Sequence, residues 1–194
     1  MDAIRLATTQ VAYLLLPLIG SVSCAAIVLA FDLWPWLKRP LDGGATFRDR
    51  RVFGDNKTWR GVASAWVGCV ATVALQKYVI ADRAGDLAVI DYGSASAVAL
   101  GTAFAVGAVV GELPNSFVKR QIGIAPGGRP TGLFVPIFYT WDQIDALFAA
   151  WPLLLFWVRP SAALLLASFV VVFVAHQIVS LVGLLIGARR SSYW

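Results

Sequence analysis

The sequence has few charged residues, few cysteines and a single histidine. Only 14% of its 194 residues are charged and 59% are hydrophobic, whereas a soluble domain usually carries about 25% charged residues. Two cysteines are too few for a disulfide framework, and they lack the neighbouring ligands that a zinc site needs. We find no Ser-His-Asp arrangement and no cluster of His or Cys for a transition metal. These shortages argue against a soluble domain, a disulfide-stabilised domain and a serine hydrolase.

Apolar runs long enough to cross a hydrocarbon core, which takes about 20 residues per helix, make up most of the chain. We therefore expect an all-α, polytopic membrane protein, with residues 1–194 as a single membrane-embedded domain. The runs predict about five transmembrane helices, of which the third and fourth are short and border polar motifs. The predicted helices cover residues 11–33, 59–80, 95–110, 141–158 and 161–187.

The distribution of lysine and arginine predicts the orientation, because short cytoplasmic loops are enriched in these residues. Segment 34–60 holds seven of them, and the loop after the third helix adds three. Segment 81–94, by contrast, holds one arginine against three aspartates. The pattern places the N-terminus outside, the C-terminus in the cytoplasm, and cytoplasmic loops at about 34–58 and 117–140.

The net charge of +5 is then largely accounted for by the cytoplasmic loops. Basic loops beside a bilayer attract anionic lipid headgroups and phosphates. We therefore expect membrane lipids as partners and no nucleic acid.

The first cytoplasmic loop ends in Gly-Asp-Asn-Lys-Thr, residues 54–58, directly before the second helix. Backbone N–H groups at a helix start, together with Lys57 and Thr58, can hold phosphate oxygens. The alternative is a solvated basic loop in which Asp55 or Asn56 caps the helix. The interleaved glycines and polar residues favour a phosphate site, although the spacing is not that of a Walker P-loop.

The end of the third helix carries Glu112, Ser116, Lys119 and Arg120, at offsets of four, seven and eight residues. These side chains can share one helical face, although Pro114 can kink the helix. An acid at the end of a spanning run costs free energy unless it is paired, metal-bound or hydrated. A metal site and a salt bridge from Glu112 to Lys119 or Arg120 both satisfy that requirement, and the sequence leaves the two open.

The fourth helix opens with two carboxylates, Asp142 and Asp145, three residues apart on one face and at the level of Glu112. Like charges at this spacing repel each other, and a cation offsets the repulsion. Hard oxygen ligands suit Mg²⁺, which commonly binds through one or two carboxylates plus substrate phosphates. The alternative is helix capping by Asp142 and a favourable interaction of both acids with the helix dipole. Because both residues border hydrocarbon, we favour the metal.

In this order and on this topology, the three clusters resemble the CDP-archaeol synthase family, small relatives of the phosphatidate cytidylyltransferases. The resemblance rests on Gly-Asp-Asn-Lys-Thr-Trp-Arg-Gly at 54–61, Ser-Phe-Val-Lys-Arg at 116–120 and Asp-Gln-Ile-Asp at 142–145. The last two look like the Ser-x-x-Lys-Arg and Asp-x-x-Asp elements of the wider cytidylyltransferase signature. Two departures stand out. Glu112 occupies a position where the family usually has aspartate, and Ile-Ala-Pro-Gly at 124–127 replaces the Lys-Asp of the bacterial phosphatidate enzymes.

The resemblance implies an enzyme of lipid biosynthesis that transfers a cytidylyl group from CTP to a lipid phosphate. The products are a CDP-lipid and pyrophosphate, and the reaction uses Mg²⁺ on the cytoplasmic face of the cell membrane. The residues fit this chemistry independently, because a phosphate monoester with a second pKa of about 6 is already mostly dianionic at neutral pH. No strong general base is therefore required.

The predicted site combines three groups of side chains. The metal ligands are the acids nearest the membrane boundary, Glu112, Asp142 and Asp145. The catalytic and phosphate-binding residues are Lys57, Ser116, Lys119 and Arg120, with Asp55, Asn56 and Thr58 nearby and Arg48, Arg50 and Arg51 as further candidates for the lipid phosphate.

Two other functions remain open from the sequence. A lipid kinase or phosphotransferase would use similar groups but transfer the γ-phosphoryl group. A small transporter would line an ion path with acids, although those acids are expected at mid-helix rather than at one end. The expected partners of the enzyme are CTP, a lipid phosphate and membrane lipids, and an oligomer is compatible with the sequence.

Overall fold

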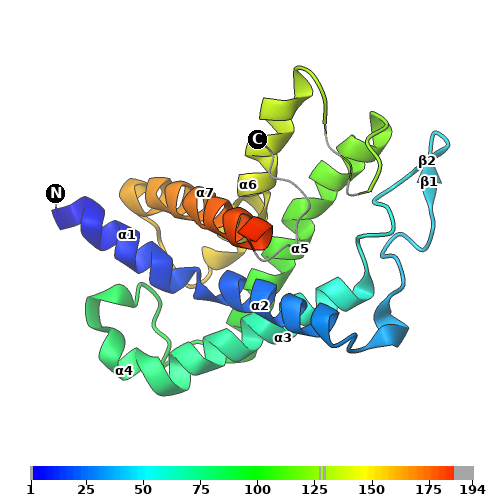
Figure 1. Ribbon diagram of the computed structural model, residues 1–194. Helices are drawn as coiled ribbons and strands as arrows, with labels where there is room; N and C mark the ends of the chain where they lie inside the picture. The colour runs from blue at the N-terminus through cyan, green and yellow to red at the C-terminus, as the bar shows by residue number, and fades with distance from the viewer. Residues whose placement is uncertain (1, 127, 129, 186–194) are drawn as a thin grey trace.

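The computed structural model describes residues 2–126, 128 and 130–185, and nearly all of its regular structure is helical (Figure 1). The α-helices are α1 (Asp2–Leu14), α2 (Leu16–Ala30), α3 (Trp59–Leu75), α4 (Ala81–Ala84), α5 (Ala97–Gln121), α6 (Phe134–Leu154) and α7 (Ala162–Leu185). A π-helical turn, η2 (Gln76–Ile80), continues α3, and 3-10 turns cover η1 (Pro35–Leu37) and η3 (Gly85–Leu87). A two-stranded hairpin, β1 (Thr46–Phe47) and β2 (Arg50–Arg51), is the exception to an all-α fold.

Three helical stretches in the described residues are long and apolar enough to cross a membrane: Ile4–Ala30, Trp59–Leu87 and Ala97–Gln121. Helix α6 is not among them, and the apolar stretch found within the described side chains of α7 is Ala162–Ile178. The structure therefore supports a polytopic helical membrane protein, while five spans remain a prediction.

Several helix boundaries differ from the predicted ones. The first helical stretch begins at Asp2 rather than at residue 11, and it is interrupted at Leu15. Helices α5 and α6 are not short, because they continue through the polar motifs that were expected to end them. The expected loop 117–140 is consequently reduced to 122–133. The predicted end of the last helix at 187 lies outside the described residues.

Glycines on α5 allow that helix to approach α6 closely, and Figure 1 shows the two side by side. A Cβ on Gly107 would lie 2.5 Å from the Cα of Ala150, and one on Gly111 would lie 2.3 Å from the backbone oxygen of Asp145. Small residues four apart allow such backbone-to-backbone packing in membrane helices. The close approach holds the C-terminal half of α5 against the aspartates of α6.

A second close approach joins α2 to α3. A Cβ on Gly68 of α3 would lie 2.4 Å from the backbone oxygen of Gly20 on α2. Helix α3 also packs on α5, where Trp66 donates a hydrogen bond to the Thr102 hydroxyl over 2.9 Å. Leu14, Leu100, Phe104 and Leu147 are fully buried between these layers and form part of one core.

The end of α3 is anchored by two polar side chains. Gln76, the first residue of η2, is fully buried and donates from Nε2 to the backbone oxygen of Tyr13 over 2.6 Å. Lys77 donates to the backbone oxygens of Gly93 and Ala95, 3.1 and 2.7 Å away. The acidic segment 81–94 is thereby fixed at one end of α3, and the basic segment 34–60 precedes the other end.

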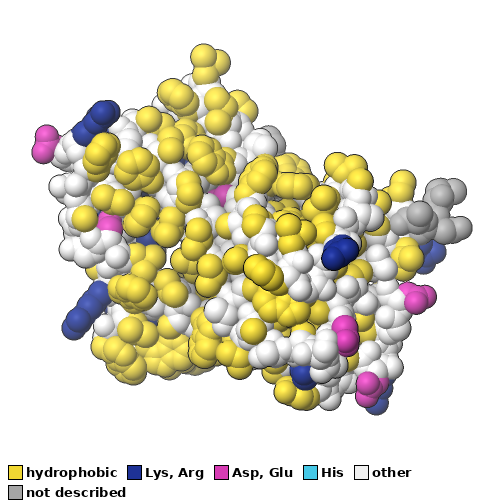
Figure 2. All heavy atoms as spheres, turned by 180° about the vertical axis from the view of Figure 1, so that it is seen from behind, with side chains coloured by type: hydrophobic (Ala, Val, Ile, Leu, Met, Phe, Trp, Pro, Cys, Tyr) yellow, Lys and Arg dark blue, Asp and Glu magenta, His cyan; other side chains and the backbone are white. Residues whose placement is uncertain are grey.

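Much of one face of the molecule consists of hydrophobic side chains (Figure 2). The charged side chains visible there lie mostly toward the left and right margins of that view. Large apolar residues that are exposed include Val98, Phe148, Phe156 and Leu166. Such a surface suits contact with hydrocarbon, where an exposed apolar side chain has no cost.

Candidate active site at the junction of the basic loop, α5 and α6

Asp42 organises the basic loop that precedes α3. Its carboxylate accepts backbone N–H groups from Gly44, Phe53 and Gly54 at 3.0, 2.9 and 3.1 Å, and the Arg51 guanidinium at 2.6 Å. Burial by itself would raise the pKa of Asp42, but these donors together hold it well below its usual range. Asp42 was not predicted as a site residue, although an aspartate before two glycines in a basic segment is a turn signal.

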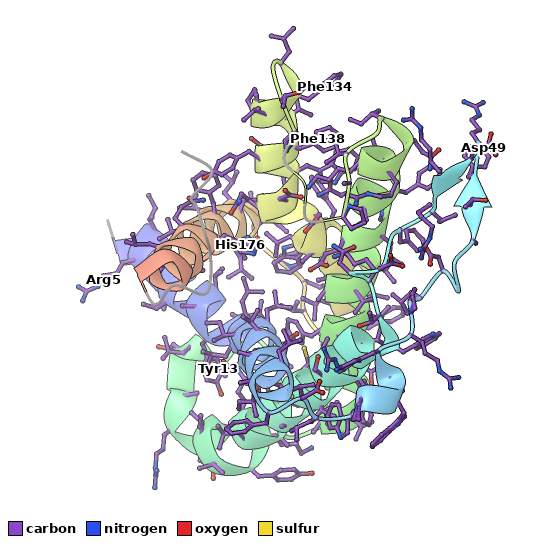
Figure 3. All side chains as sticks on the ribbon, turned by 45° about the vertical axis from the view of Figure 1, so that its right-hand side comes forward. Arg5, Tyr13, Asp49, Phe134, Phe138 and His176 are labelled. Atoms are coloured by element: carbon purple, nitrogen blue, oxygen red, sulfur yellow. The ribbon has the colours of Figure 1, made fainter. Side chains whose placement is uncertain are left out.

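The hairpin that follows Asp42 docks on the C-terminal end of α5. Its register pairs Thr46 with Arg51 and Phe47 with Arg50, and Arg48 and Asp49 form its turn with φ of 53° and 61°. Asp49 lies at the tip and points away from the helices (Figure 3). The Phe47 ring packs against the Phe117 ring of α5, with centroids 5.8 Å apart. Positive φ at both turn residues is the geometry of a tight hairpin. The hairpin therefore forms because of its turn residues and not because of an alternating pattern of polar and apolar residues in its strands.

The three arginines assigned to the lipid phosphate have different surroundings. Arg51 bridges Asp42 and Asp55 at 2.6 Å each. Arg50 donates to the backbone oxygen of Gln121 at the end of α5. Arg48 is exposed, and its guanidinium carbon lies 5.3 Å from the centroid of the Phe47 ring. Arg50 and Arg51 thus hold the loop in place, and Arg48 lies at the hairpin turn.

Thr58 caps α3 by accepting the N–H of Gly61 over 3.2 Å. The alternative in which Asp55 or Asn56 caps this helix is therefore wrong: Asp55 pairs with Arg51, and Asn56 is exposed. Gly54 has a φ of 95° and lies against Pro126, whose Cγ would be 2.8 Å from a Cβ at this position. The segment 54–58 thus touches the loop that joins α5 to α6.

Lys57 forms an ion pair with Glu112 of α5. The lysine side chain is 22% exposed and the glutamate side chain 49% exposed, so water reaches the pair. The expected alternative, a salt bridge from Glu112 to Lys119 or Arg120, names the wrong partner, because residues seven or eight positions apart are about 10 Å apart along a helix. The ion pair joins the end of the basic loop to the helix that carries the remaining site residues.

Two carboxylates, one amide and one ammonium group meet between α5 and α6. Lys119 donates to both carboxylate oxygens of Asp142, at 2.5 and 2.6 Å. Asn115 donates from Nδ2 to Asp142 and, over 3.1 Å, to Asp145. We call Asn115, Lys119, Asp142 and Asp145 the acid–amide cluster. Because Asp142 lies well inside α6 rather than at its start, the helix-capping alternative is also wrong.

The position of Lys119 is further defined by an aromatic side chain. Its Nζ lies 5.5 Å from the centroid of the Phe138 ring, which stacks on Trp141 at 6.1 Å. Phe138 is labelled on α6 in Figure 3, one helical turn before Asp142. An ammonium group over an aromatic face gains electrostatic stabilisation. The lysine is thus held at the polar end of α6 rather than free to reach bulk water.

Asn115 is the member of the cluster that sequence reasoning missed. It is 2% exposed, and its Oδ1 has no hydrogen-bond partner among the described residues. The available signal was a polar residue one helical turn before Lys119 and next to Ser116, but asparagine carries no charge to mark it. Its unpartnered oxygen is a hard ligand, and it belongs to the amide group whose Nδ2 contacts both carboxylates.

Arg120 and Ser116 accompany the cluster on α5. Arg120 is 7% exposed, and its Nε and Nη1 have no partner within the described part of the chain. Ser116 is half-buried on the same helix. A buried guanidinium with free N–H groups is costly to keep, since each unsatisfied donor forfeits its hydration. An anion such as a phosphate would satisfy these donors.

The oxygen atoms of the cluster suit a hard divalent cation. Two carboxylates and an amide oxygen are a donor set that Mg²⁺ accepts, and the unpartnered Oδ1 of Asn115 adds an oxygen that sequence analysis had not counted. Within residues 2–126, 128 and 130–185, however, no three acids, histidines or cysteines group as a metal site. Glu112 is engaged with Lys57 instead.

The fold and site together define a helical membrane protein in which a basic loop meets one buried and one partly buried aspartate at one end of the bundle. The family model for CarS-like CDP-archaeol synthases matches residues 4–193, and the chain belongs to this family.

Individual relatives agree with this membership. The CDP-archaeol synthase of Thermococcus onnurineus is 38% identical over 113 residues, 58% of either chain. That of Halobacterium salinarum is 40% identical over 114 residues, 58% of this chain and 56% of the relative. The chain thus aligns with a little more than half the length of these two. The Methanosarcina barkeri enzyme is 29% identical over 170 residues, 80% of this chain and 90% of the relative.

A solved structure shares the fold. It is described as an intramembrane enzyme for archaeal membrane lipids biosynthesis, and it superposes with a TM-score of 0.61 at 21% identity. The match covers 86% of this chain and 92% of the other. The overall arrangement of the helices therefore recurs in a second protein.

Proposed function

We propose that the chain transfers the cytidylyl group of CTP to a lipid phosphate of the archaeol type, giving a CDP-lipid and pyrophosphate. The observation that carries this proposal is the acid–amide cluster, together with Arg120 on the same helix α5, a buried guanidinium whose Nε and Nη1 lack partners among the described residues. Membership of the CDP-archaeol synthase family supports the same reaction.

In this reaction a non-bridging oxygen of the lipid phosphate attacks the α-phosphorus of CTP. The bond from that phosphorus to the oxygen shared with the β-phosphate breaks, and the electron pair leaves with pyrophosphate. The attacking phosphate is already ionised near neutral pH, so no side chain has to remove a proton. Lys119 and Arg120 would bind phosphate oxygens and stabilise charge on the departing pyrophosphate. Ser116 and segment 54–58 would contribute further contacts to the nucleotide.

Asp142, Asp145 and the Oδ1 of Asn115 would hold Mg²⁺. When bound, Mg²⁺ would supply charge neutralisation to the triphosphate. Glu112 would join these ligands on releasing Lys57, whose ammonium group would then be available for a phosphate. The half-exposed state of the Lys57–Glu112 pair favours such an exchange, because a solvated ion pair of this kind contributes only about 0–1 kcal/mol.

We place this site on the cytoplasmic face of the cell membrane, with the N-terminus outside, since CTP is a cytoplasmic nucleotide and segment 34–60 is rich in lysine and arginine. Single cysteines at Asn56 and at Gly85, in a chain with Cys24 and Cys69 replaced by serine, test the orientation. The cysteine at 56 should react only with reagents that enter the cell, and the one at 85 with impermeant reagents. Labelling of position 56 by an impermeant reagent would place the site away from its nucleotide.

The reaction itself is tested with protein purified in detergent, Mg²⁺, and CTP labelled at the α-phosphate. Incubation with a panel of ether- and ester-linked lipid phosphates should move the label into a lipid product and release pyrophosphate. A lipid kinase would instead transfer a γ-phosphate label and release a nucleoside diphosphate. Transfer of γ-label without α-label would refute the cytidylyltransferase proposal.

A further inference from the structure

An apolar groove of 640 Å³ lies between α5 and α6, next to the acid–amide cluster. Val110 and Pro114 contribute its α5 wall, and Ile144 and Phe148 contribute part of its α6 wall. Among the described residues, Asp145 is the only charged side chain that lines it. A volume in this range is typical of a small-molecule site, but an apolar lining with one acid does not suit a nucleotide.

The groove follows α6 for three helical turns. Its lining residues on that helix recur on one face from Ile137 to Ala149, a distance of about 18 Å at 1.5 Å per residue. Ile137 is 57% exposed and Phe148 is 62% exposed, so the groove is open along its side. Such an open apolar side suits contact with hydrocarbon rather than with water.

The groove is continuous with the proposed reaction site through one residue. Asp145 lines the groove and also accepts a hydrogen bond from Asn115 of the acid–amide cluster. Lys119 lies at the N-terminal half of α6, held by Asp142 and Phe138. A molecule whose phosphate meets Lys119 can therefore extend an apolar chain past Asp145 and along α6 into the groove.

Phe148 defines the inner end of this groove. Its ring packs against the Phe169 ring of α7, with centroids 5.7 Å apart, so α7 limits its movement. The neighbouring lining residue, Ala149, is small, and Gly111 lies opposite on α5. The groove is therefore wide beside these small residues, and the Phe148 ring narrows it one helical turn beyond Asp145.

We infer that the groove binds one hydrocarbon chain of the lipid phosphate, and that Phe148 is the residue that selects chains by length. The inference rests on the proposed function for the identity of the headgroup. Shortening Phe148 extends the groove toward Phe169, and enlarging it closes the groove nearer to Asp145. Phe148 does not touch the reacting phosphates, so the KM for CTP should not depend on its size.

The test compares kcat/KM for lipid phosphates that differ only in chain length, using wild type, Phe148→Ala and Phe148→Trp. The ratio of long-chain to short-chain substrate should rise about tenfold in the alanine variant and fall about tenfold in the tryptophan variant, as for other changes in apolar pockets. Phe156→Ala is the matched control, since Phe156 lies just beyond α6, is 82% exposed and does not line the groove. Its ratio should equal that of wild type.

A binding measurement separates this inference from the proposed reaction. Cysteine at Ala149, in the background without Cys24 and Cys69, should react with an apolar thiol reagent and be protected by a long-chain lipid phosphate but not by glycerol phosphate. Protection without any CTP-dependent product would sustain the groove and refute the reaction. Product formation with unchanged chain selectivity in both Phe148 variants, and no protection at 149, would refute the groove. A folded Phe148→Leu variant replaces Phe148→Ala if the latter loses its thermal transition.

Discussion

The two ends of α3 and α5 hold their polar groups in different ways. At the end that faces the basic loop, ion pairs join residues that are far apart in the chain, as in Lys57 with Glu112 and Lys119 with Asp142. At the opposite end, Asp91 accepts hydrogen bonds from Gly93 and Ser94, only two and three residues away. Within the described residues of segment 81–94, no ion pair is formed.

The contrast separates two uses of polar residues. Local hydrogen bonds such as those of Asp91 fix the shape of a connecting segment and need no other helix. Long-range pairs bring charge to one place from separate helices, at a free-energy cost that a purely structural loop would not require. Matched residues at the two ends should therefore differ in their effect on activity more than in their effect on stability.

The largest difference in activity is expected between substitutions of two aspartates, one at each end. Asp142→Asn should lower kcat/KM for cytidylyl transfer on the order of 1,000-fold, because it weakens the charge of the acid–amide cluster at its centre. Asp91→Asn at the other end should leave turnover within about twofold of wild type, as expected for a surface change. Activity at saturating and at limiting Mg²⁺, with a thermal transition in detergent as the folding control, measures both. Near-normal turnover of Asp142→Asn at limiting Mg²⁺ would remove the metal assignment.

The next largest difference in activity is expected between substitutions of two lysines, one at each end. Lys119→Ala should lower kcat about 100-fold, since its proposed role is to stabilise charge during transfer. Lys77→Ala loses the hydrogen bonds to the Gly93 and Ala95 backbone oxygens and a contact with the Tyr78 ring, all away from the proposed site, so kcat should be unchanged. Steady-state kinetics of the two purified variants provide the comparison. If Lys119→Ala is inactive only because it fails to fold, the lysine is structural and the two ends do not differ in the proposed way.

Asp42 gives a pH-dependent difference in stability. Because its folded-state pKa lies below the unfolded value of about 4, its contribution is complete above that value and is lost as the pH falls toward the folded-state pKa. Asp42→Asn should cost roughly 2 kcal/mol near pH 7 by removing charge-assisted hydrogen bonds. The difference in Tm between wild type and variant should narrow below about pH 4, as followed by tryptophan fluorescence. A constant difference across this range would contradict the role given to the Asp42 charge.

The smallest effects are expected at two helix caps. Thr58 caps α3 beside the site, and Ser96 caps α5 at the opposite end by accepting the Ala99 N–H over 3.3 Å. Alanine at either position should cost about 1 kcal/mol of stability. Thr58→Ala should also raise the KM for CTP, whereas Ser96→Ala should not. Equal KM values in the two variants would limit Thr58 to capping.

The helical fold class and the separation of the basic segment from the acidic segment could be predicted, because they depend on composition and on local runs of similar residues. The apolar centres of the helices were located correctly, as for α3, which begins at Trp59 as expected. The ends of α5 and α6 were not, since polar residues that would end an isolated apolar run are satisfied here by a neighbouring helix. Periodicity cannot detect such partners.

The residues of the candidate site likewise divide into those that could be predicted from the sequence and those that could not. Lys119, Asp142 and Asp145 were predicted from their charge, and the structure brings them together. Asn115 and Asp42 were not, because their importance depends on which donors and acceptors meet them in the folded chain. Likewise Glu112 and Lys57 were both predicted but not as a pair, since 55 residues separate them.

The π-helical turn Gln76–Ile80 has a consequence for how α3 can change during evolution. Such a turn accommodates one more residue than an α-helix of the same rise, so a deletion within it restores regular hydrogen bonding. Because the extra residue is absorbed within the turn, the deletion leaves the segments on either side close to their original rise and changes only the directions of side chains inside the turn. Lys77 would then turn away from the carbonyls of Gly93 and Ala95, while Gly68 and the seam with α2 would keep their phase. Length variation at this turn would therefore remodel the outer connection while the bundle beneath it stays in register.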